Sequence, residues 1–259
     1  MSLISHQKPN WNKLYQTHAN KHFIEADPIQ LAYQYSDPRD QEFISFLTCL
    51  FAYGGRPLII KTVSQILEPF GKQPLDKLLA SSEKDWQKWL AGFYYRFNTL
   101  PDLLFILSAL KSTYRKYDSL EAAWQKHAVK NDTKASLSAF QNFIMSESQL
   151  VLPDTYGMQF ILAEPMKGSA AKRLNMFLRW VVRDDEVDLG LWKNALTPAD
   201  LIIPLDTHVA RQSRKYRITK RASNDWKTAE EITAYFRKID ASDPVRFDLA
   251  MMGLGTTKT

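Results

Sequence analysis

The order of apolar and polar residues predicts helices along most of the chain. In the stretch 170–183, apolar side chains recur at i, i+3, i+4 and i+7, which places them on one face of a helix. These side chains are Leu174, Phe177, Leu178 and Val181. Runs of alternating Val, Ile and Thr, which are typical of half-buried strands, are scarce. The pattern therefore predicts an all-α protein of roughly ten to a dozen helices.

Punctuating residues divide this pattern into segments. Asp-Pro pairs at 27–28, 37–38 and 243–244 are typical of helix starts, and the glycine pair at 54–55 is typical of a helix end. The predicted helices cover, in order, residues 28–35, 38–53, 57–69, 75–81, 86–95, 103–117, 119–130, 134–147, 170–183, 206–216, 223–236 and 244–253. The pattern contains neither an internal repeat nor a linker.

Composition narrows the class of protein. The chain has 259 residues, of which 45% are hydrophobic and 12% aromatic, so we expect a folded globule and not a disordered chain. Cys49 is the one cysteine, which excludes a disulfide within the chain, a Cys-rich zinc site and a four-cysteine iron–sulfur cluster. Residues 1–8 are too polar for a signal peptide, and no apolar run approaches the ~20 residues of a membrane span. We therefore expect a cytoplasmic protein with no membrane partner.

Charge indicates the type of partner. The formal net charge is +6, which favours a polyanion, with nucleic acid the first choice. Residues 206–238 contain nine Lys and Arg against four Asp and Glu, which makes this segment a candidate phosphate-binding surface. A moderately basic enzyme without a polyanionic partner remains an alternative.

Lys172 is a candidate nucleophile at the start of a predicted helix. On that helix it lies opposite the apolar stripe and shares its face with Met176, Arg179 and Arg183. This face is either a solvated basic surface or the lining of a cleft. In a cleft, the neighbouring arginines would lower the pKa of the Lys172 amine, and an uncharged amine can attack a sugar carbon.

Asp206 and His208 have structural interpretations beside the functional ones. An Asp before a helix is a common N-cap, yet a carboxylate held in that way can also stabilise positive charge on a sugar ring. His208 has no second ligand at metal spacing, so we expect neither a metal nor a cofactor. Trp180, Trp192 and Trp226 either stack on an exposed base or lie in the core.

Three segments carry a resemblance to a known superfamily. Pro204-Leu-Asp-Thr-His-Val-Ala-Arg211 resembles the Asp-Thr-His-Val-x-Arg segment of helix-hairpin-helix DNA glycosylases, which include endonuclease III and the 8-oxoguanine glycosylases. Gly168-Ser-Ala-Ala-Lys172 looks like a degenerate form of the hairpin-plus-lysine segment, and residues 247–255 are similar to the closing helix. The match covers roughly residues 160–255, whereas the earlier helices agree with that layout only in number and style.

The sequence also departs from the superfamily. Gly168 is the one glycine left in the hairpin, iron–sulfur ligands are absent, and the spacer between Lys172 and Asp206 is long. A long spacer with an altered hairpin is similar to the archaeal 8-oxoguanine glycosylase branch. The whole chain also looks like an uncharacterised bacterial family.

The resemblance implies a fold, a reaction and site residues. It implies an N-terminal segment, 1–25, and one all-α unit of two packed lobes, 26–259, with a cleft between the lobes. Lys172 would be the nucleophile and Asp206 the catalytic carboxylate, while Asp248, Trp180 and Phe177 would bind the base, although Phe177 falls on the core stripe. The expected DNA contacts are Gly168, Arg173, Arg179, His208, Arg211 and Arg214.

Three functional hypotheses follow. The first is a monomeric DNA repair glycosylase, with accompanying strand cleavage, that acts on double-stranded DNA carrying a damaged base, 8-oxoguanine being the first choice. The second is a non-catalytic nucleic-acid-binding protein of the same fold. The third is a helical scaffold for protein partners, in which Lys172 is solvated and Asp206 is only a cap.

Overall fold

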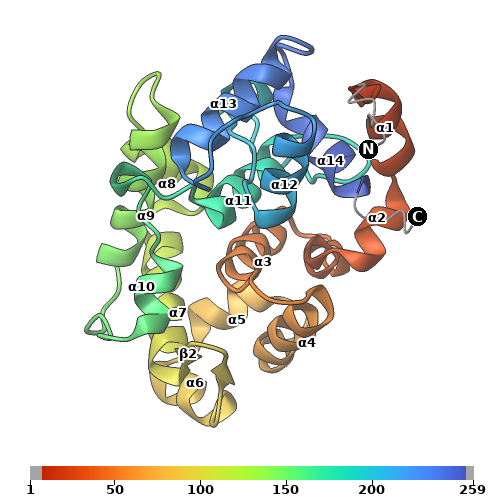
Figure 1. Cartoon of the computed structure of the whole chain (residues 1–259). Coiled ribbons are helices and arrows are strands. Elements are labelled where there is room, and N and C mark those ends of the chain that lie inside the picture. The colour runs from red at the N-terminus through yellow and green to blue at the C-terminus, as the bar shows by residue number, and fades with distance from the viewer. Residues whose placement is uncertain (1–7, 255–259) are drawn as a thin grey trace. The chain divides into compact units, whose positions relative to one another are not determined.

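The computed structural model describes residues 8–254, and within this range it is mostly helical, with one two-stranded sheet (Figure 1). The predicted all-α class is confirmed. Predictions for residues 1–7 and for Gly255 lie outside the described residues. The chain divides into two compact units, the first formed by residues 1–25 with 167–259 and the second by residues 26–166.

The second unit contains most of the predicted helices at their expected places. Its elements are η1 (Pro28–Gln34), α3 (Pro38–Leu50), α4 (Arg56–Leu67), η2 (Glu68–Phe70), α5 (Pro74–Ala80), α6 (Glu83–Trp89), β1 (Tyr94–Tyr95), β2 (Asn98–Thr99), α7 (Leu100–Tyr117), α8 (Leu120–His127), α9 (Thr133–Ser146) and α10 (Tyr156–Ile161). A 3-10 helix, η3 (Pro165–Lys167), leads from this unit to the first.

Helix α3, which starts at an N-cap and is mostly buried, forms part of the core of the second unit. The Asp37 side chain accepts a hydrogen bond from the Arg39 amide at 2.7 Å, and Pro38 occupies the first helical position, so α3 starts where the Asp-Pro pair predicts. Most of α3 is apolar all round and is buried, including Cys49, Phe46 and Leu47.

Two predictions in this unit are wrong in part. Residues 28–34 form a 3-10 helix and not an α-helix. The helix predicted for 86–95 ends at Trp89, and Gly92, with a left-handed φ of 79°, lies in the turn that follows. The residues that follow form a hairpin, with Tyr94 paired to Thr99 and Tyr95 to Asn98. The loop expected around Pro153–Gly157 leads into α10, which Thr155 caps.

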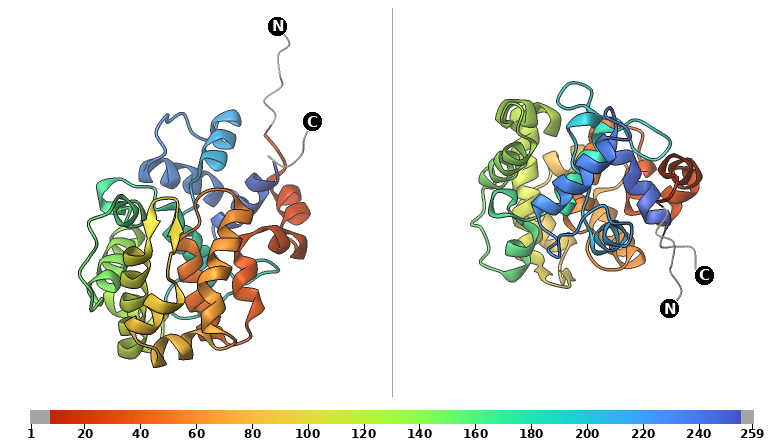
Figure 2. Two further views of the ribbon diagram at one scale, coloured as in Figure 1. Left: turned by 90° about the horizontal axis from the view of Figure 1, so that it is seen from below. Right: turned by 45° about the horizontal axis from the view of Figure 1, so that its top comes forward.

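The first unit joins the two ends of the described chain. Its elements are α1 (Trp11–His18), α2 (Lys21–Ala26, which ends at the boundary), α11 (Lys172–Val182), η4 (Pro198–Asp200), α12 (Thr207–Lys215), α13 (Trp226–Arg237), η5 (Pro244–Arg246) and α14 (Phe247–Gly253). Helices α1 and α14 pack side by side, as the red and violet-blue ribbons of Figure 2 show. Trp11 is only 4% exposed and its indole ring meets Phe236 edge-on at 5.1 Å.

Within residues 8–254, no helix combines the length and the apolar character that a membrane crossing requires.

Candidate active site

Lys172 begins α11 after a sharp turn. Gly168 and Ala171 both have positive φ values, 98° and 44°, so the backbone turns sharply just before the lysine. The carbonyl oxygen of Gly168 accepts a hydrogen bond from the Trp226 amide at 3.0 Å, which ties this turn to the start of α13. The Lys172 side chain is partly exposed. The segment that was compared with the glycosylase hairpin therefore positions the lysine at a helix start, as predicted.

Asp206 is the N-cap of α12. Its Oδ1 accepts a hydrogen bond from the Val209 amide at 2.7 Å, and its side chain is partly buried. The preceding residues, 201–205, are buried and anchor the start of the helix in the unit. The structural interpretation of Asp206 is thus confirmed, and it leaves the carboxylate in a fixed orientation.

His208 connects α12 to α14. Its Nε2 lies 2.8 Å from the Met251 carbonyl oxygen, and because a carbonyl only accepts, Nε2 carries the hydrogen. Nδ1 then accepts a hydrogen bond from Arg211 Nη2 at 3.2 Å. These contacts show His208 in a structural role that holds the Asp206 cap beside α14.

Asp248 brings the two candidate catalytic residues into one electrostatic environment. It lies in the first turn of α14, is only 3% exposed, and accepts a hydrogen bond from Arg179 Nη1 at 2.5 Å. Burial raises the pKa of Asp248 above its usual range; Arg179 and Lys172 oppose this, and Asp206 adds to it. Lys172 and Asp206 therefore both contribute to the electrostatic environment of this buried carboxyl group.

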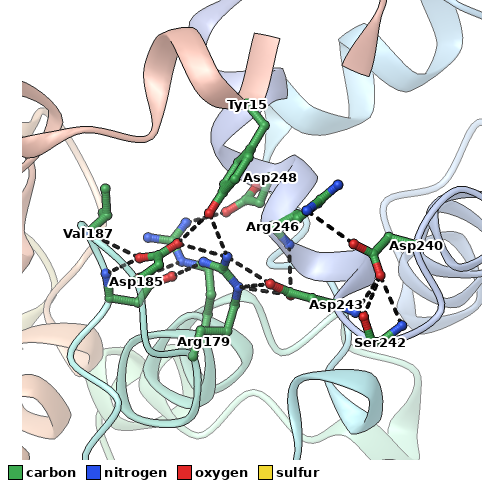
Figure 3. A network of polar contacts seen from close by, with 11 residues as sticks. Tyr15, Arg179, Asp185, Val187, Asp240, Ser242, Asp243, Arg246 and Asp248 are labelled. Carbon is green, nitrogen blue, oxygen red and sulfur yellow. Dashed lines mark hydrogen bonds and ion pairs between the residues drawn. The ribbon is translucent and has the colours of Figure 1, made fainter. Parts of the chain in front are cut away.

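Asp248 and Arg179 belong to a larger network of buried ion pairs (Figure 3). Arg179 also pairs with Asp188 through Nε at 3.2 Å, and Asp188 in turn pairs with Arg183. Arg183 reaches Asp243 at 2.9 Å and Asp185 at 2.8 Å, so its guanidinium touches three carboxylates.

The network also extends to the N-terminal helix. The hydroxyl of Tyr15 on α1 donates a hydrogen bond to Asp185 at 2.8 Å. Through this bond, α1 is connected to α11, to the loop that follows it and to η5.

The protonation of the network follows from its burial. Burial raises the pKa of Asp188 to about 6, although Arg179 and Arg183 both act to lower it. Burial alone would raise the pKa of Asp185 as well, but Arg183 and two backbone amides hold it below its usual range. Burial and the bond to Asp185 raise the pKa of Tyr15 to about 12. Arg183 stays charged, because its three carboxylate partners outweigh the effect of its burial on its pKa.

Several predicted contact residues lie away from the surface. Arg179 is 2% exposed and neutralised by Asp188 and Asp248, so the expected phosphate contact is wrong. The face of α11 that carries Lys172 is accordingly not a solvated basic surface beyond its first turn. Trp180 and Phe177 are 0% and 1% exposed, which argues against stacking on a base. They are core residues, and the Phe177 ring meets Trp192 edge-on at 5.4 Å.

The remaining predicted DNA contacts differ in accessibility. Arg211 is exposed, and Arg173 and Gly168 are partly exposed. Arg214 is partly exposed, but its guanidinium donates to the carbonyl oxygens of Arg221 and Ala222, each at 2.8 Å. Its role is therefore to hold the loop between α12 and α13.

Sequence reasoning missed the acidic half of the network. Tyr15, Asp185, Asp188 and Asp243 come from three separate segments and meet around Arg183. A signal was present in the sequence, since two arginines four residues apart on a strongly amphipathic helix are followed directly by the acidic loop 184–190. An arginine pair on a helix that must be buried requires carboxylate partners nearby.

The arrangement combines a helix-start amine, a fixed carboxylate and a buried acid in one unit. Such a set can support attack by an amine and transfer of a proton between carboxyl groups. Among the side chains of residues 8–254, no group of three or more His, Cys, Asp or Glu could hold a metal ion.

Comparisons with known proteins complete the description. Neither the curated proteins nor the solved structures include a match to this chain. A family model described as "protein of unknown function (DUF2400)" matches residues 27–257. This stretch covers most of both units, including Lys172, Asp206 and Asp248, and the chain therefore belongs to the DUF2400 family.

Proposed function

We propose that this protein is a DNA repair glycosylase that removes a damaged base through a Schiff base on Lys172. The observation that carries the proposal is that Lys172 begins α11 and Asp206 caps α12 in the same unit, and that both act electrostatically on the buried carboxyl of Asp248. The resemblance of residues 204–211 to the glycosylase superfamily supplies the reaction class. Oxidised guanine, 8-oxoguanine, remains the first choice of base.

The proposed reaction begins with the uncharged amine of Lys172. Its lone pair forms a bond to C1′ of the sugar while the bond between C1′ and the base nitrogen breaks, and the base leaves with that electron pair and takes up a proton. Asp206 stabilises the positive charge that develops on the sugar ring and accepts the proton lost by the attacking amine. Opening of the ring then gives the Schiff base.

The second half of the reaction cleaves the strand. Loss of a proton from C2′ of the Schiff base expels the 3′ phosphate, and water then hydrolyses the Schiff base to free Lys172. As the ring opens, Asp206 passes the proton that it took from the amine to the ring oxygen, so its carboxylate is again able to accept the proton lost from C2′. No oxidant or reductant is needed.

The distribution of charge supports DNA as the partner. Residues 1–25 and 167–259 carry 20 Lys and Arg against 13 Asp and Glu, a formal net charge of +7. Residues 26–166 carry 14 against 15, a formal net charge of −1. The excess positive charge is thus confined to the unit that holds Lys172 and Asp206, as a duplex-binding surface requires.

The test is borohydride trapping on duplexes that carry a single damaged base, beginning with 8-oxoguanine. Reduction of a Schiff base would fix a covalent adduct, which should form with the wild type and disappear in Lys172→Gln. The matched control is Lys167→Gln, because Lys167 is an exposed lysine just before the turn. An adduct that survives Lys172→Gln would show that another group is the nucleophile.

A non-catalytic DNA-binding protein is the second candidate. The turn at residues 168–171 favours this candidate. It contains one glycine, and the carbonyl oxygen of that glycine, Gly168, accepts a hydrogen bond from the Trp226 amide. Under this alternative, the wild type binds duplex DNA at low salt and forms no adduct with any lesion. Salt-sensitive binding without base release would therefore support the second candidate in place of the first.

A further inference from the structure

An exposed aromatic cluster lies in the second unit, far along the chain from Lys172. The side chains of Phe97 and Tyr156 are 39% and 63% exposed. Phe97 lies in the turn of the β1–β2 hairpin and Tyr156 begins α10. A group of solvent-exposed aromatic side chains often marks a binding surface.

The rings of this cluster are held in fixed positions. Phe97 lies parallel to Tyr53, with centroids 6.2 Å apart and an interplanar angle of 4°. It also meets Tyr156 edge-on at 5.0 Å and Phe160 at 5.4 Å. These contacts fix the Phe97 ring while leaving part of it exposed, so that binding would require little further ordering.

The scaffold beneath the rings is equally constrained. A Cβ added to Gly157 would lie 2.3 Å from the Phe97 carbonyl oxygen, so the hairpin and α10 are in direct backbone contact. Thr155, the N-cap of α10, donates a hydrogen bond to Asp102 at 2.6 Å, and the same Asp102 accepts from the Thr99 amide at 2.8 Å. The hairpin and α10 therefore form one rigid support for the exposed rings.

Arg96 adds a positive charge to this surface. Its guanidinium lies over the Phe97 ring, 5.6 Å from the centroid, and close to Gly54 before the start of α4. Arg96 occupies the hairpin turn with a left-handed φ of 54°, where glycine, asparagine or aspartate is the usual residue and an arginine costs about 1 kcal/mol. An arginine at such a position indicates that its side chain has a use other than folding.

We propose that Phe97, Tyr156 and Arg96 form a binding surface for an unpaired base and its phosphate in a nucleic-acid strand. A planar aromatic face stacks on any base, and the adjacent guanidinium pairs with the phosphate. A proline-rich peptide also binds aromatic surfaces, but it carries no phosphate to match Arg96. The proposal does not depend on the chemistry at Lys172.

The experiment measures binding of a fluorescent single-stranded oligonucleotide, ten thymidines long, to the full chain by anisotropy. Tyr156→Ala should weaken binding roughly 10-fold, because stacking of one base is lost. The matched control is Tyr33→Ala, another exposed tyrosine of the same unit, which should bind as the wild type does.

Arg96→Gly provides a variant that keeps the fold. Glycine adopts a left-handed φ without strain, so the melting temperature should not fall, while affinity for the oligonucleotide should drop about 5-fold. Photo-crosslinking of an oligonucleotide with 5-iodouracil, followed by mass spectrometry, should place adducts on Phe97 or Tyr156. Unchanged affinity in both variants, crosslinks confined to residues 167–254, or binding of a proline-rich peptide in place of the oligonucleotide would each overturn the proposal.

Discussion

Asp206 caps α12 and, in the proposed reaction, is also the catalytic carboxylate, and substitutions can separate the two roles. Asparagine retains an acceptor for the Val209 amide, whereas alanine removes it. We therefore expect Asp206→Asn to unfold within about 0.5 kcal/mol of the wild type and Asp206→Ala to lose about 1 kcal/mol, as measured by urea denaturation. Base release should be lost in both. Normal turnover by Asp206→Asn would restrict Asp206 to the capping role.

Asp188 should make stability depend on pH. Its pKa of about 6 in the folded state lies above the ordinary aspartate value of 3.8, so between these values the folded protein holds a proton that the unfolded chain releases. Asp188 therefore adds up to ~3 kcal/mol to the free energy of unfolding below pH ~4, and this contribution is lost as the pH rises to ~6. Urea denaturation at several pH values should show this fall.

The matched variant for this prediction is Asp188→Asn, which carries no titrating proton at that position. Its unfolding free energy should be lower overall, because Arg179 and Arg183 lose a charged partner. Relative to the wild type, however, its stability should rise between pH ~4 and ~6. Parallel pH profiles for the two proteins would contradict the assignment of this proton to Asp188.

At the level of single elements, local signals predicted most helices and tertiary contacts decided the rest. Asp37-Pro38 and Asp206 mark helix starts because the cap and its amide lie within three residues of each other. The hairpin of Tyr94 and Tyr95 was missed because its support comes from Gly157, some sixty residues later. The burial of Arg179 could not be predicted because its partner Asp248 lies 69 residues away.

The packing of α1 on α14 offers a test at this scale. A Cβ on Gly253 would lie 2.0 Å from the His18 ring, so α1 can approach only a glycine there. We expect Gly253→Ala to lower the unfolding free energy by about 1–3 kcal/mol, since an added methyl group must displace the ring. Gly55→Ala is the control, because a Cβ at Gly55 would meet nothing within 4 Å.

His18→Ala in the same background should restore part of the loss. Removing the ring makes room for the new methyl group, so the double variant should be more stable than the sum of the two single changes predicts. Independent, additive effects in the double-mutant cycle would show that the clash is relieved in another way. The measurement is urea denaturation of the four proteins of the cycle.

At the level of the whole molecule, the sequence predicted the all-α class and the net positive charge, but not how the chain divides into two units. Residues 1–25 were expected to stand apart, yet Trp11 and Tyr15 contact residues beyond 180 and belong to the same unit as Lys172. No local pattern identifies such a pairing of chain ends, because its determinants are more than 160 residues apart. The division matters for function because it assigns a net charge of +7 to one unit and −1 to the other.

Under the proposed function, this asymmetry of charge predicts which lysines govern DNA affinity. Lys215, Lys220 and Lys227 are exposed in the basic unit, and Lys84, Lys88 and Lys130 are exposed in the other. Changing the first three to glutamine should weaken duplex binding and lower the slope of log Kd against log salt by about one for each phosphate contact removed. The same change at the second three alters net charge equally but should leave the slope unchanged. Equal effects of the two triple variants would mean that the overall charge of the protein, and not a surface of the Lys172 unit, attracts DNA.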